Sequence, residues 1–473
     1  MTLIFSNHKF QYEIERLFRS FFPPMELKLS TDRADAQGDY CLTEKAVNGG
    51  SVELSVELVC GGGSFSMTRT VPAGTPDREQ ERELSVLLYK ALREHTGRDL
   101  PWGILTGVRP VKVLSRLTDA QALQSLLVSG RKLRLARQIQ QVQKPLEESI
   151  PVNSFSLYVS IPFCPTRCSY CSFVSHSVGQ AAARLDEYLE RMREELKQLA
   201  TISRHLGLVP DTIYFGGGTP TVLSAEQLKR LLSALEWFDL SKVREFTVEA
   251  GRPDTITVEK LETIKAAGAE RISVNPQTMN DEVLKVIGRA HDSAQTEQAF
   301  LMAREIGFKV INMDLIAGLP TDTFESFAAS LDAVCGLSPE NITVHSLSLK
   351  RAASLFRSGA ENTAGTAEKM IDYAHQRLAE CGYIPYYLYR QKNTADNQEN
   401  TGYAKPGCES LYNTYIMEEL QTILAVGAGA STKLVDRKTG RIKRITNHKY
   451  PYEYLDRFDD ILENKREIFR FFV

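Results

Sequence analysis

The chain lacks a strong charge of either sign, a long apolar run and a dense set of cysteines. Lys and Arg number 57 and Asp and Glu 59, so the formal net charge is −2, whereas nucleic-acid-binding proteins are usually strongly basic. No apolar run approaches the roughly 18–20 residues that cross a bilayer, and the N-terminus lacks a charged segment followed by a long apolar stretch. We therefore expect no nucleic-acid partner, no membrane span and a cytoplasmic location.

Cysteine is too sparse for a disulfide scaffold, because there are eight in 473 residues. Hydrophobic residues make up 42% and charged residues 25%, which is typical of a globular protein and excludes disorder, collagen and coiled coil as the main state. Three of the cysteines crowd into residues 164–171. In a reducing compartment such a cluster more often binds metal or performs redox chemistry than forms disulfides.

Residues 1–150 are predicted to form one mixed α/β domain. Helical patterns cover 10–22 and 77–95, two β-like stretches at 51–60 and 64–71 flank a glycine turn, and 131–144 is basic and amphipathic. Pro145 and Pro151 are expected to mark the end of this domain.

Strand-like runs alternate with helices from residue 154 onward. The strand candidates are 155–161, 212–215, 245–249, 271–275, 309–315 and 341–347. The helix candidates are 181–205, 225–238, 258–267, 281–287 with 294–306, and 324–335. Six β-α units predict an α/β fold in which 151–360 form a partial (β/α)6 barrel, with its chemistry at the C-terminal ends of the strands. Residues 361–473 are less regular and predict an α+β extension with a basic hairpin over 433–449.

The cysteine cluster follows the first predicted barrel strand. It reads Cys164-Pro-Thr-Arg-Cys168-Ser-Tyr-Cys171, with the spacing C-x3-C-x2-C. Three thiolates can hold a [4Fe–4S] cluster and leave one iron open to a non-protein ligand, since four protein thiolates are the usual complement. His176 lies five residues beyond Cys171, so a Cys3His zinc site is the alternative that the triplet alone leaves open.

Polar and glycine-rich segments follow the next strands. The run Phe215-Gly-Gly-Gly-Thr-Pro220 lets the backbone approach a ligand closely. Glu249, Gln277 and Asp314 each end a predicted strand, and Arg289 accompanies them. Because the C-terminal ends of parallel strands meet at one edge, these residues are candidates for a single site.

Several motifs closely resemble the oxygen-independent coproporphyrinogen III oxidase family of the radical S-adenosylmethionine (SAM) superfamily. They are Tyr158-Val-Ser-Ile-Pro-Phe-Cys164, Phe-Gly-Gly-Gly-Thr-Pro220, Val-Glu-Ala-Gly-Arg-Pro253, Pro-Gln-Thr-Met279 and Asp314-Leu-Ile-Ala-Gly-Leu-Pro320. The resemblance covers about 154–350. The segments 103–112, 386–392 and 397–407 are similar to the HemZ-type coproporphyrinogen dehydrogenase branch.

The resemblance implies a [4Fe–4S] cluster held by Cys164, Cys168 and Cys171, with SAM on the open iron. One electron from the cluster then cleaves SAM and releases a 5′-deoxyadenosyl radical, while the protein supplies binding and orientation. By the same resemblance, the residues around SAM are Tyr158, Tyr170, Gly217, Gly218, Thr219, Glu249, Gln277, Arg289, Asp314 and Ser348.

The implied activity is conversion of coproporphyrinogen III propionates to vinyl groups, giving protoporphyrinogen IX in haem biosynthesis. The implied partners are this tetrapyrrole substrate and an electron donor such as flavodoxin or ferredoxin. One position departs from the established decarboxylase, which has a further cysteine where this chain has Phe173; phenylalanine there resembles the haem-chaperone members. A haem-binding chaperone, and a radical SAM enzyme acting on haem or another tetrapyrrole, are therefore the alternatives.

Cations and histidines supply candidates for binding the tetrapyrrole. Arginine and lysine suit its propionates, and histidine suits haem iron in the chaperone alternative. The propionate candidates are Arg109, Lys112, Arg351, Arg390 and Lys392, and the haem-ligand candidates are His176, His291 and His345.

Overall fold

The computed structural model describes residues 1–22, 25–171, 176–348, 365–392 and 394–473. It divides the chain into two compact units, Met1–Gln140 (unit 1) and Gln141–Val473 (unit 2). The division lies within helix α5 (Gly130–Glu148), which contains Pro145 in its last turn. The sequence predicts a domain boundary marked by Pro145 and Pro151, and α5 runs through the first of these prolines.

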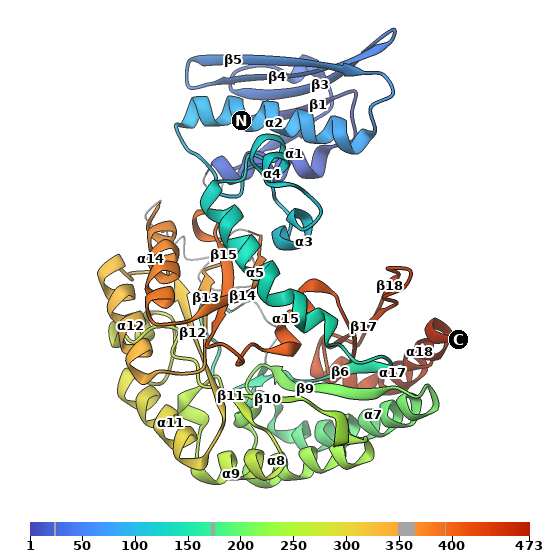
Figure 1. Ribbon diagram of the computed structural model, residues 1–473, viewed down its shortest axis with the longest axis vertical. Coiled ribbons are helices and arrows are strands. Elements are labelled where there is room, and N and C mark those ends of the chain that lie inside the picture. Colours follow the sequence, from blue (N-terminus) through green and yellow to red (C-terminus); the bar gives the residue numbers. More distant parts are fainter. Residues whose placement is uncertain (23–24, 172–175, 349–364, 393) are drawn as a thin grey trace. The chain divides into compact units, whose positions relative to one another are not determined.

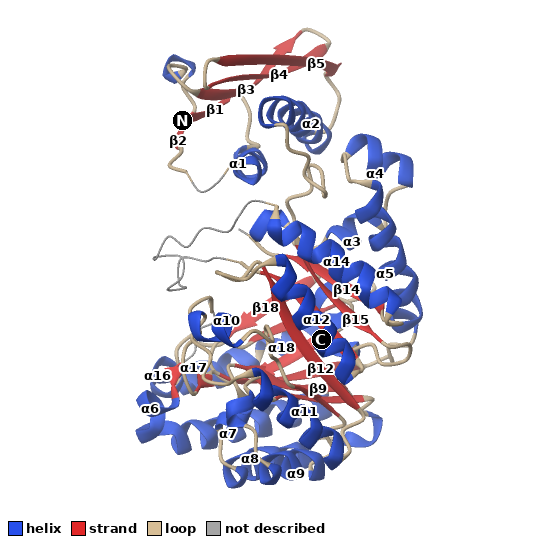
Figure 2. Cartoon of the chain, turned by 90° about the vertical axis from the view of Figure 1, so that its left-hand side faces the viewer, coloured by secondary structure: helices blue, strands red, loops and turns tan. Residues whose placement is uncertain are grey.

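Unit 1 is a five-stranded sheet with two long helices on one side (Figure 2). The strand order is β2-β1-β3-β4-β5. The elements are β1 (Thr2–Ser6), α1 (Gln11–Phe21), β2 (Lys28–Ser30), η1 (Arg33–Asp35), β3 (Tyr40–Asn48), β4 (Ser51–Cys60), β5 (Gly63–Pro72), α2 (Asp77–Thr96), α3 (Pro110–Leu114) and α4 (Asp119–Ser125), before α5. The predicted helices and the β4–β5 hairpin are confirmed, whereas β1, β2 and β3 are strands that the sequence analysis does not predict.

Unit 2 is built on one large, mainly parallel sheet. Among the described residues this sheet has the order β14-β15-β13-β12-β11-β10-β9-β6-β16-β17-β18. The strands are β6 (Ser154–Ile161), β9 (Val209–Gly217), β10 (Glu245–Glu249), β11 (Arg271–Ser273), β12 (Val310–Ala317), β13 (Asn341–Ser346), β14 (Ile384–Arg390), β15 (Glu399–Ala404), β16 (Thr422–Val426), β17 (Ser431–Val435) and β18 (Ile442–Thr446), and β7 (Phe163–Cys164) pairs separately with β8 (His176–Ser177). The six predicted barrel strands are confirmed as β6 and β9–β13, all parallel neighbours.

Helices line the outer side of the curved sheet of unit 2 (Figure 1). The described helices of unit 2 are α6 (Val178–Ala181), α7 (Leu185–His205), α8 (Ala225–Leu232), α9 (Val258–Ala266), α10 (Asp281–Val286), α11 (Ser293–Ile306), α12 (Phe324–Leu337), α14 (Thr366–Glu380), α15 (Leu411–Glu418), α16 (Pro451–Asp456), α17 (Phe458–Lys465) and α18 (Glu467–Phe472), with 3-10 turns at 182–184, 220–222, 233–237, 240–242, 253–255 and 395–397. Helix α15 lies on the inner side of the sheet. The arc formed by α7, α8, α9, α11 and α12 follows the strand order, as successive β-α units require. This is the partial α/β barrel that the sequence predicts.

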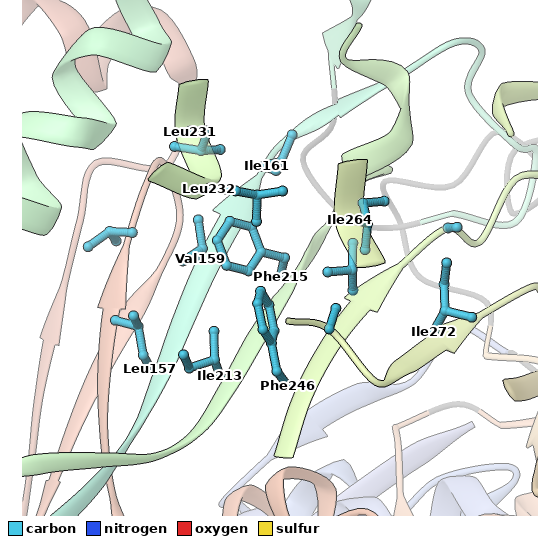
Figure 3. Close-up of a cluster of buried hydrophobic side chains, with 14 of the residues drawn as sticks. Leu157, Val159, Ile161, Ile213, Phe215, Leu231, Leu232, Phe246, Ile264 and Ile272 are labelled. Carbon is cyan, nitrogen blue, oxygen red and sulfur yellow. The ribbon is translucent and has the colours of Figure 1, made fainter. Parts of the chain in front are cut away.

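Apolar residues alternate with polar residues or tyrosine along β6, so one side of the strand faces the helices and the other faces the barrel interior. Leu157, Val159 and Ile161 are fully buried and pack with apolar residues of β9 and β10 and with helices α8 and α9 (Figure 3). The intervening residues of β6 are Ser156, Tyr158 and Ser160. Burial of each large apolar side chain contributes about 1.5–3 kcal/mol, so the outer side stabilises the barrel and leaves its interior free to carry polar groups.

The C-terminal segment extends the barrel sheet at both edges. Strands β15 and β14 add beyond β13, and β16 pairs parallel with β6 before β17 and β18. All six residues of β15 are buried, although the polar run Glu-Asn-Thr-Gly over 399–402 would suggest a loop. The tertiary environment overrides the weak β-propensity of Glu-Asn-Thr-Gly in this strand.

Among the helices that the structure describes, none combines the length and the apolar character that a membrane crossing would need.

Gly427, between β16 and β17, provides a test of backbone packing. It has a φ of +94° and its added Cβ would overlap the carbonyl oxygen of Ser160, whereas Gly429 (φ +70°) would meet its nearest heavy atom, in Lys449, at 3.5 Å. Gly429→Ala should lower the free energy of unfolding by about 1 kcal/mol, because alanine is strained in the left-handed conformation but meets no steric clash there. Gly427→Ala should cost about 2–3 kcal/mol, measured by denaturant unfolding. Equal costs for the two variants would contradict this packing.

Candidate active site

Three tyrosines stack inside the barrel and form the floor of the site. Tyr214 of β9 stacks on Tyr412 of α15, with ring centroids 4.4 Å apart, and Tyr158 of β6 stacks on Tyr412 at 6.1 Å. Tyr158 and Tyr214 are register partners on neighbouring strands. Helix α15 is held in place because Glu245, at the start of β10, accepts hydrogen bonds from three groups at its N-terminus, within 3.2 Å.

Glu249 lies at the C-terminal end of β10, above this floor. The Tyr214 hydroxyl donates a 2.6 Å hydrogen bond to its Oε1. Burial raises the pKa of Glu249 to about 7, and the charge of Asp314 acts in the same direction, while the hydrogen bonds from Tyr214 and the Gly217 backbone oppose the rise. The carboxyl group is therefore partly protonated near neutral pH.

Glu249→Gln should flatten the pH dependence of stability. Between about pH 4.5 and 7 the folded chain holds a proton on Glu249 that the unfolded chain has lost, so the wild-type free energy of unfolding falls as pH rises. The rise in the pKa of Glu249 corresponds to about 3 kcal/mol of unfolding free energy. Because the Glu249 side chain is partly exposed, we expect a change of about 2 kcal/mol between the two pH values. Denaturant unfolding at pH 5 and pH 8 measures the difference; identical pH slopes would show that Glu249 is not desolvated.

Asp314 carries the second carboxylate of the site, on the inner side of β12. Its Oδ1 accepts a 2.8 Å hydrogen bond from Asn312, and its Oδ2 lies 3.7 Å from His345 Nε2. Burial opposes ionisation of Asp314, but its interactions with His345, Asn312 and Thr343 outweigh burial and lower its pKa. The site therefore holds one anionic carboxylate and one that titrates near neutrality.

The cysteine loop, residues 164–171, lies against the ends of two barrel strands. Thr219 Oγ1 donates to Cys164 Sγ at 3.5 Å, and Arg252 Nη1 donates to Cys168 Sγ at 3.4 Å. The backbone N–H of Cys171 donates to the carbonyl of Cys168 at 3.1 Å. All three cysteines are free thiols and half-buried.

The glycines after β9 allow the backbone to pack against the cysteine loop. The Gly218 and Thr219 N–H groups donate to the carbonyls of Ile161 and Phe163, both at 2.8 Å. A Cβ on Gly218 would lie 2.5 Å from the Phe163 oxygen, and Gly217 has a φ of +109°. Both positions therefore require glycine, which explains this part of the predicted motif.

Arg289 joins the cysteine loop to the end of β10. Its Nη2 donates to the Tyr170 hydroxyl at 3.0 Å and its Nη1 to the Gly251 carbonyl at 2.9 Å. Its Nε is buried and makes no hydrogen bond to any residue that the structure describes. Two further buried oxygens in the described chain, Ser273 Oγ and Asn275 Oδ1, lack partners beside the end of β11. Unpaired buried polar groups are costly, so these atoms suit a polar ligand.

The remaining predicted cofactor residues lie farther along the same edge. Gln277 has a φ of +70° and its backbone pairs with Asp314 and Ile316 at 2.9 Å, so it adjoins Asp314. Ser348 follows β13 and donates its hydroxyl hydrogen to the Lys392 carbonyl at 2.8 Å. Among the described residues, no hydrogen bond joins Ser348 to the other predicted cofactor residues.

The predicted tetrapyrrole-binding residues differ in their local surroundings. Arg390 is buried and donates to the Asn397 backbone and side chain within 3.0 Å, so it has a structural role. The His291 side chain is fully buried, 3.6 Å from Asp254. His345 is exposed at 26% beside Asp314. Arg109 and Lys112 belong to unit 1 and Lys392 follows β14. Phe173, Arg351 and the His176 side chain lie outside the described residues.

The donor chemistry fits an iron–sulfur cluster with a polar ligand. The cysteine loop provides three free thiols and no other described histidine or carboxylate completes a set with them. Within the described ranges, no three such side chains are gathered closely enough to bind a metal as they stand. Because thiolate ligands must be deprotonated, binding of a cluster by this loop would release protons and would be coupled to folding of the loop.

Three residues of the site are absent from the sequence predictions. Tyr214 and Arg252 lie within or next to the quoted motifs, two residues before Gly216 and three after Glu249. The inward register of β9 could have indicated Tyr214. Tyr412 comes from a distant helix and carries no local signal.

Comparisons with known proteins show what the chain is similar to. The Radical SAM superfamily model matches residues 158–334. The chain is 40% identical to the "Oxygen-independent coproporphyrinogen-III oxidase-like protein HemZ" of Bacillus subtilis (strain 168), over 82% of this chain and 81% of that protein. It is 34% identical to "Heme chaperone HemW" of the same organism, over 58% and 70%. The solved structure of coproporphyrinogen III oxidase (HemN) from Escherichia coli, a radical SAM enzyme, superposes with a TM-score of 0.54 at 26% identity, covering 68% of this chain and 72% of that one.

Proposed function

Because the chain belongs to the radical SAM superfamily and, within it, to the family of oxygen-independent coproporphyrinogen-III oxidase-like proteins, we propose that it oxidatively decarboxylates coproporphyrinogen III. In this reaction each of two propionates loses one hydrogen atom, CO2 and one electron, which passes to a one-electron acceptor, and becomes a vinyl group. The observation that carries the proposal is the 40% identity to the HemZ protein over four fifths of both chains.

Cys164, Cys168 and Cys171 would hold a [4Fe–4S] cluster. When bound, the cluster and SAM supply one-electron radical chemistry that removes the hydrogen atom. The SAM site would comprise Tyr158, Tyr170, Gly217, Gly218, Thr219, Glu249, Gln277, Arg289, Asp314 and Ser348. A protein electron donor such as a flavodoxin or ferredoxin would reduce the cluster.

The charges of the site match the polar groups of SAM. Arg289 offers an unpaired buried Nε–H to the carboxylate of SAM. Glu249 and Asp314 offer acceptor oxygens to its ammonium group and ribose hydroxyls, and Asp314 is held ionised by its neighbours. The stacked rings of Tyr158, Tyr214 and Tyr412 lie beside these groups, and the Tyr214 hydroxyl holds the Glu249 carboxyl group.

A haem carrier is the second candidate function. It is favoured by the 34% identity to the HemW chaperone and by Phe173 in the sequence, where the established decarboxylase has cysteine. A third candidate keeps the radical chemistry and takes haem or another tetrapyrrole as substrate.

One anaerobic experiment separates the three candidates. The full chain is reconstituted with iron and sulfide, reduced, and incubated with SAM and either coproporphyrinogen III or haem. Mass spectrometry quantifies 5′-deoxyadenosine and the tetrapyrrole products, and a parallel titration measures haem affinity.

Mono- and divinyl products that accumulate with 5′-deoxyadenosine are the expected result. If 5′-deoxyadenosine forms while coproporphyrinogen III stays intact, the proposed substrate is wrong and the proposed radical SAM chemistry is kept. Tight haem binding without substrate-dependent formation of 5′-deoxyadenosine would contradict the decarboxylase proposal and favour the haem carrier.

A further inference from the structure

Arg252 is a nearly fully buried cation beside the cysteine loop. The residue is 3% exposed. Its Nη1 donates to Cys168 Sγ at 3.4 Å, and its Nη2 donates to Thr166 Oγ1 at 3.0 Å. Nη1 also donates to the Thr166 carbonyl at 3.4 Å. Three hydrogen bonds thus join Arg252, three residues beyond the end of β10, to the cysteine loop, and Cys168 is 84 residues away in the chain.

Asp254 fixes the orientation of this guanidinium group. Arg252 Nε donates to Asp254 Oδ1 at 3.0 Å and Nη2 to Oδ2 at 3.2 Å. This bidentate pairing occupies one edge of the planar guanidinium. With Nε and Nη2 held by Asp254, Nη1 is directed toward the sulfur of Cys168. The Arg252–Cys168 contact is therefore set by the fold and not by a freely rotating side chain.

We propose that Arg252 is a positioning residue that raises the reduction potential of the cluster bound through Cys168. The inference rests on the proposed function, in which Cys168 is a cluster ligand. Reduction adds one negative charge to the cluster, and an N–H donor on a ligating sulfur stabilises that added charge. The stabilisation is large because the donor is buried and charged, and the local dielectric is low.

The matched control stands at the other end of the same strand. Arg244 immediately precedes β10 and forms a bidentate pair with Asp211, at 2.6 and 2.8 Å. It resembles Arg252 in its pairing, but no hydrogen bond of the described structure links it to a cysteine. Arg244→Gln should therefore leave the cluster potential unchanged.

An EPR-monitored redox titration of the reconstituted full chain tests the inference without measuring activity. For Arg252→Gln we expect the ratio of reduced to oxidised cluster at a fixed potential to fall about tenfold, which is 59 mV for a one-electron couple. Arg252→Lys keeps the positive charge but loses the bidentate pairing with Asp254. It should lower the ratio of reduced to oxidised cluster by less than Arg252→Gln does. Iron and sulfide contents are measured on every sample.

Equal midpoint potentials for the wild type and Arg252→Gln at equal iron content would overturn the inference alone. If Arg252→Gln assembles no cluster, Arg252→Lys decides, and a wild-type potential in that variant overturns the inference. A wild-type chain that binds no cluster would overturn the proposed function, and the inference with it.

Discussion

Cys168→Ser should abolish iron–sulfur assembly while leaving the chain folded. The proposed cluster has only three cysteine ligands, so the loss of one leaves two. A serine oxygen is a poor substitute for a thiolate on iron. The Cys168 thiol is half-buried in a loop and serine differs from it by one atom, so we expect little change in stability. After reconstitution, the wild type should hold about four iron atoms per chain and the variant well below one.

Cys60→Ser is the matched control, because Cys60 is also a half-buried free thiol but lies in β4 of unit 1. It should retain the wild-type iron content and the visible absorbance of the cluster. Iron and sulfide analysis with circular dichroism measures both properties. Full cluster content in Cys168→Ser, or its loss in Cys60→Ser, would contradict the assignment of the cysteine loop.

Lys465→Met should destabilise unit 2 by about 3–5 kcal/mol, because it leaves a buried carboxylate without its cation. Glu195 of α7 and Lys465 of α17 are both fully buried and lie 3.1 Å apart. The same carboxylate also accepts hydrogen bonds from Gly427, Tyr454 and Asn447 within 2.9 Å. The pair therefore joins α7 to the C-terminal strands and helices.

The surface pair Lys443–Glu467 provides the control for this prediction. Its atoms are 2.7 Å apart, but the side chains are 44% and 28% exposed, so Lys443→Met should cost less than about 1 kcal/mol. Denaturant unfolding measures both variants. Adding Glu195→Gln to Lys465→Met should recover part of the loss. A small effect of Lys465→Met would show that Glu195 is hydrated or neutral in the folded chain.

The barrel could be predicted from sequence because its signals are local. Alternation along residues 154–161 and the spacing of the six β-α units depend only on neighbouring residues. The glycine and cysteine motifs also identify the ends of β9 and β6, and Glu249 is found at the end of β10 as predicted, whereas Asp314 lies within β12 and not at its end. Family resemblance, rather than composition, suggested the cofactors.

Other features depend on contacts between distant residues and could not be predicted in this way. Strand β15 is polar in sequence and buried by β13 and β14 on either side. Tyr412 reaches Tyr158 from the far end of the chain, and Arg252 reaches Cys168 across the barrel edge. Pro145 lies within α5, so a proline taken as the mark of a domain boundary does not end the helix here.

The central claim, that the barrel holds an iron–sulfur cluster to which SAM binds directly, is tested most directly by EPR spectroscopy. The reduced, reconstituted wild-type chain is measured with and without saturating SAM. We predict a [4Fe–4S] signal whose g values shift when SAM is added, since one iron is free of protein ligands. An identical spectrum in both samples, or a protein that binds zinc and assembles no cluster, would contradict the account.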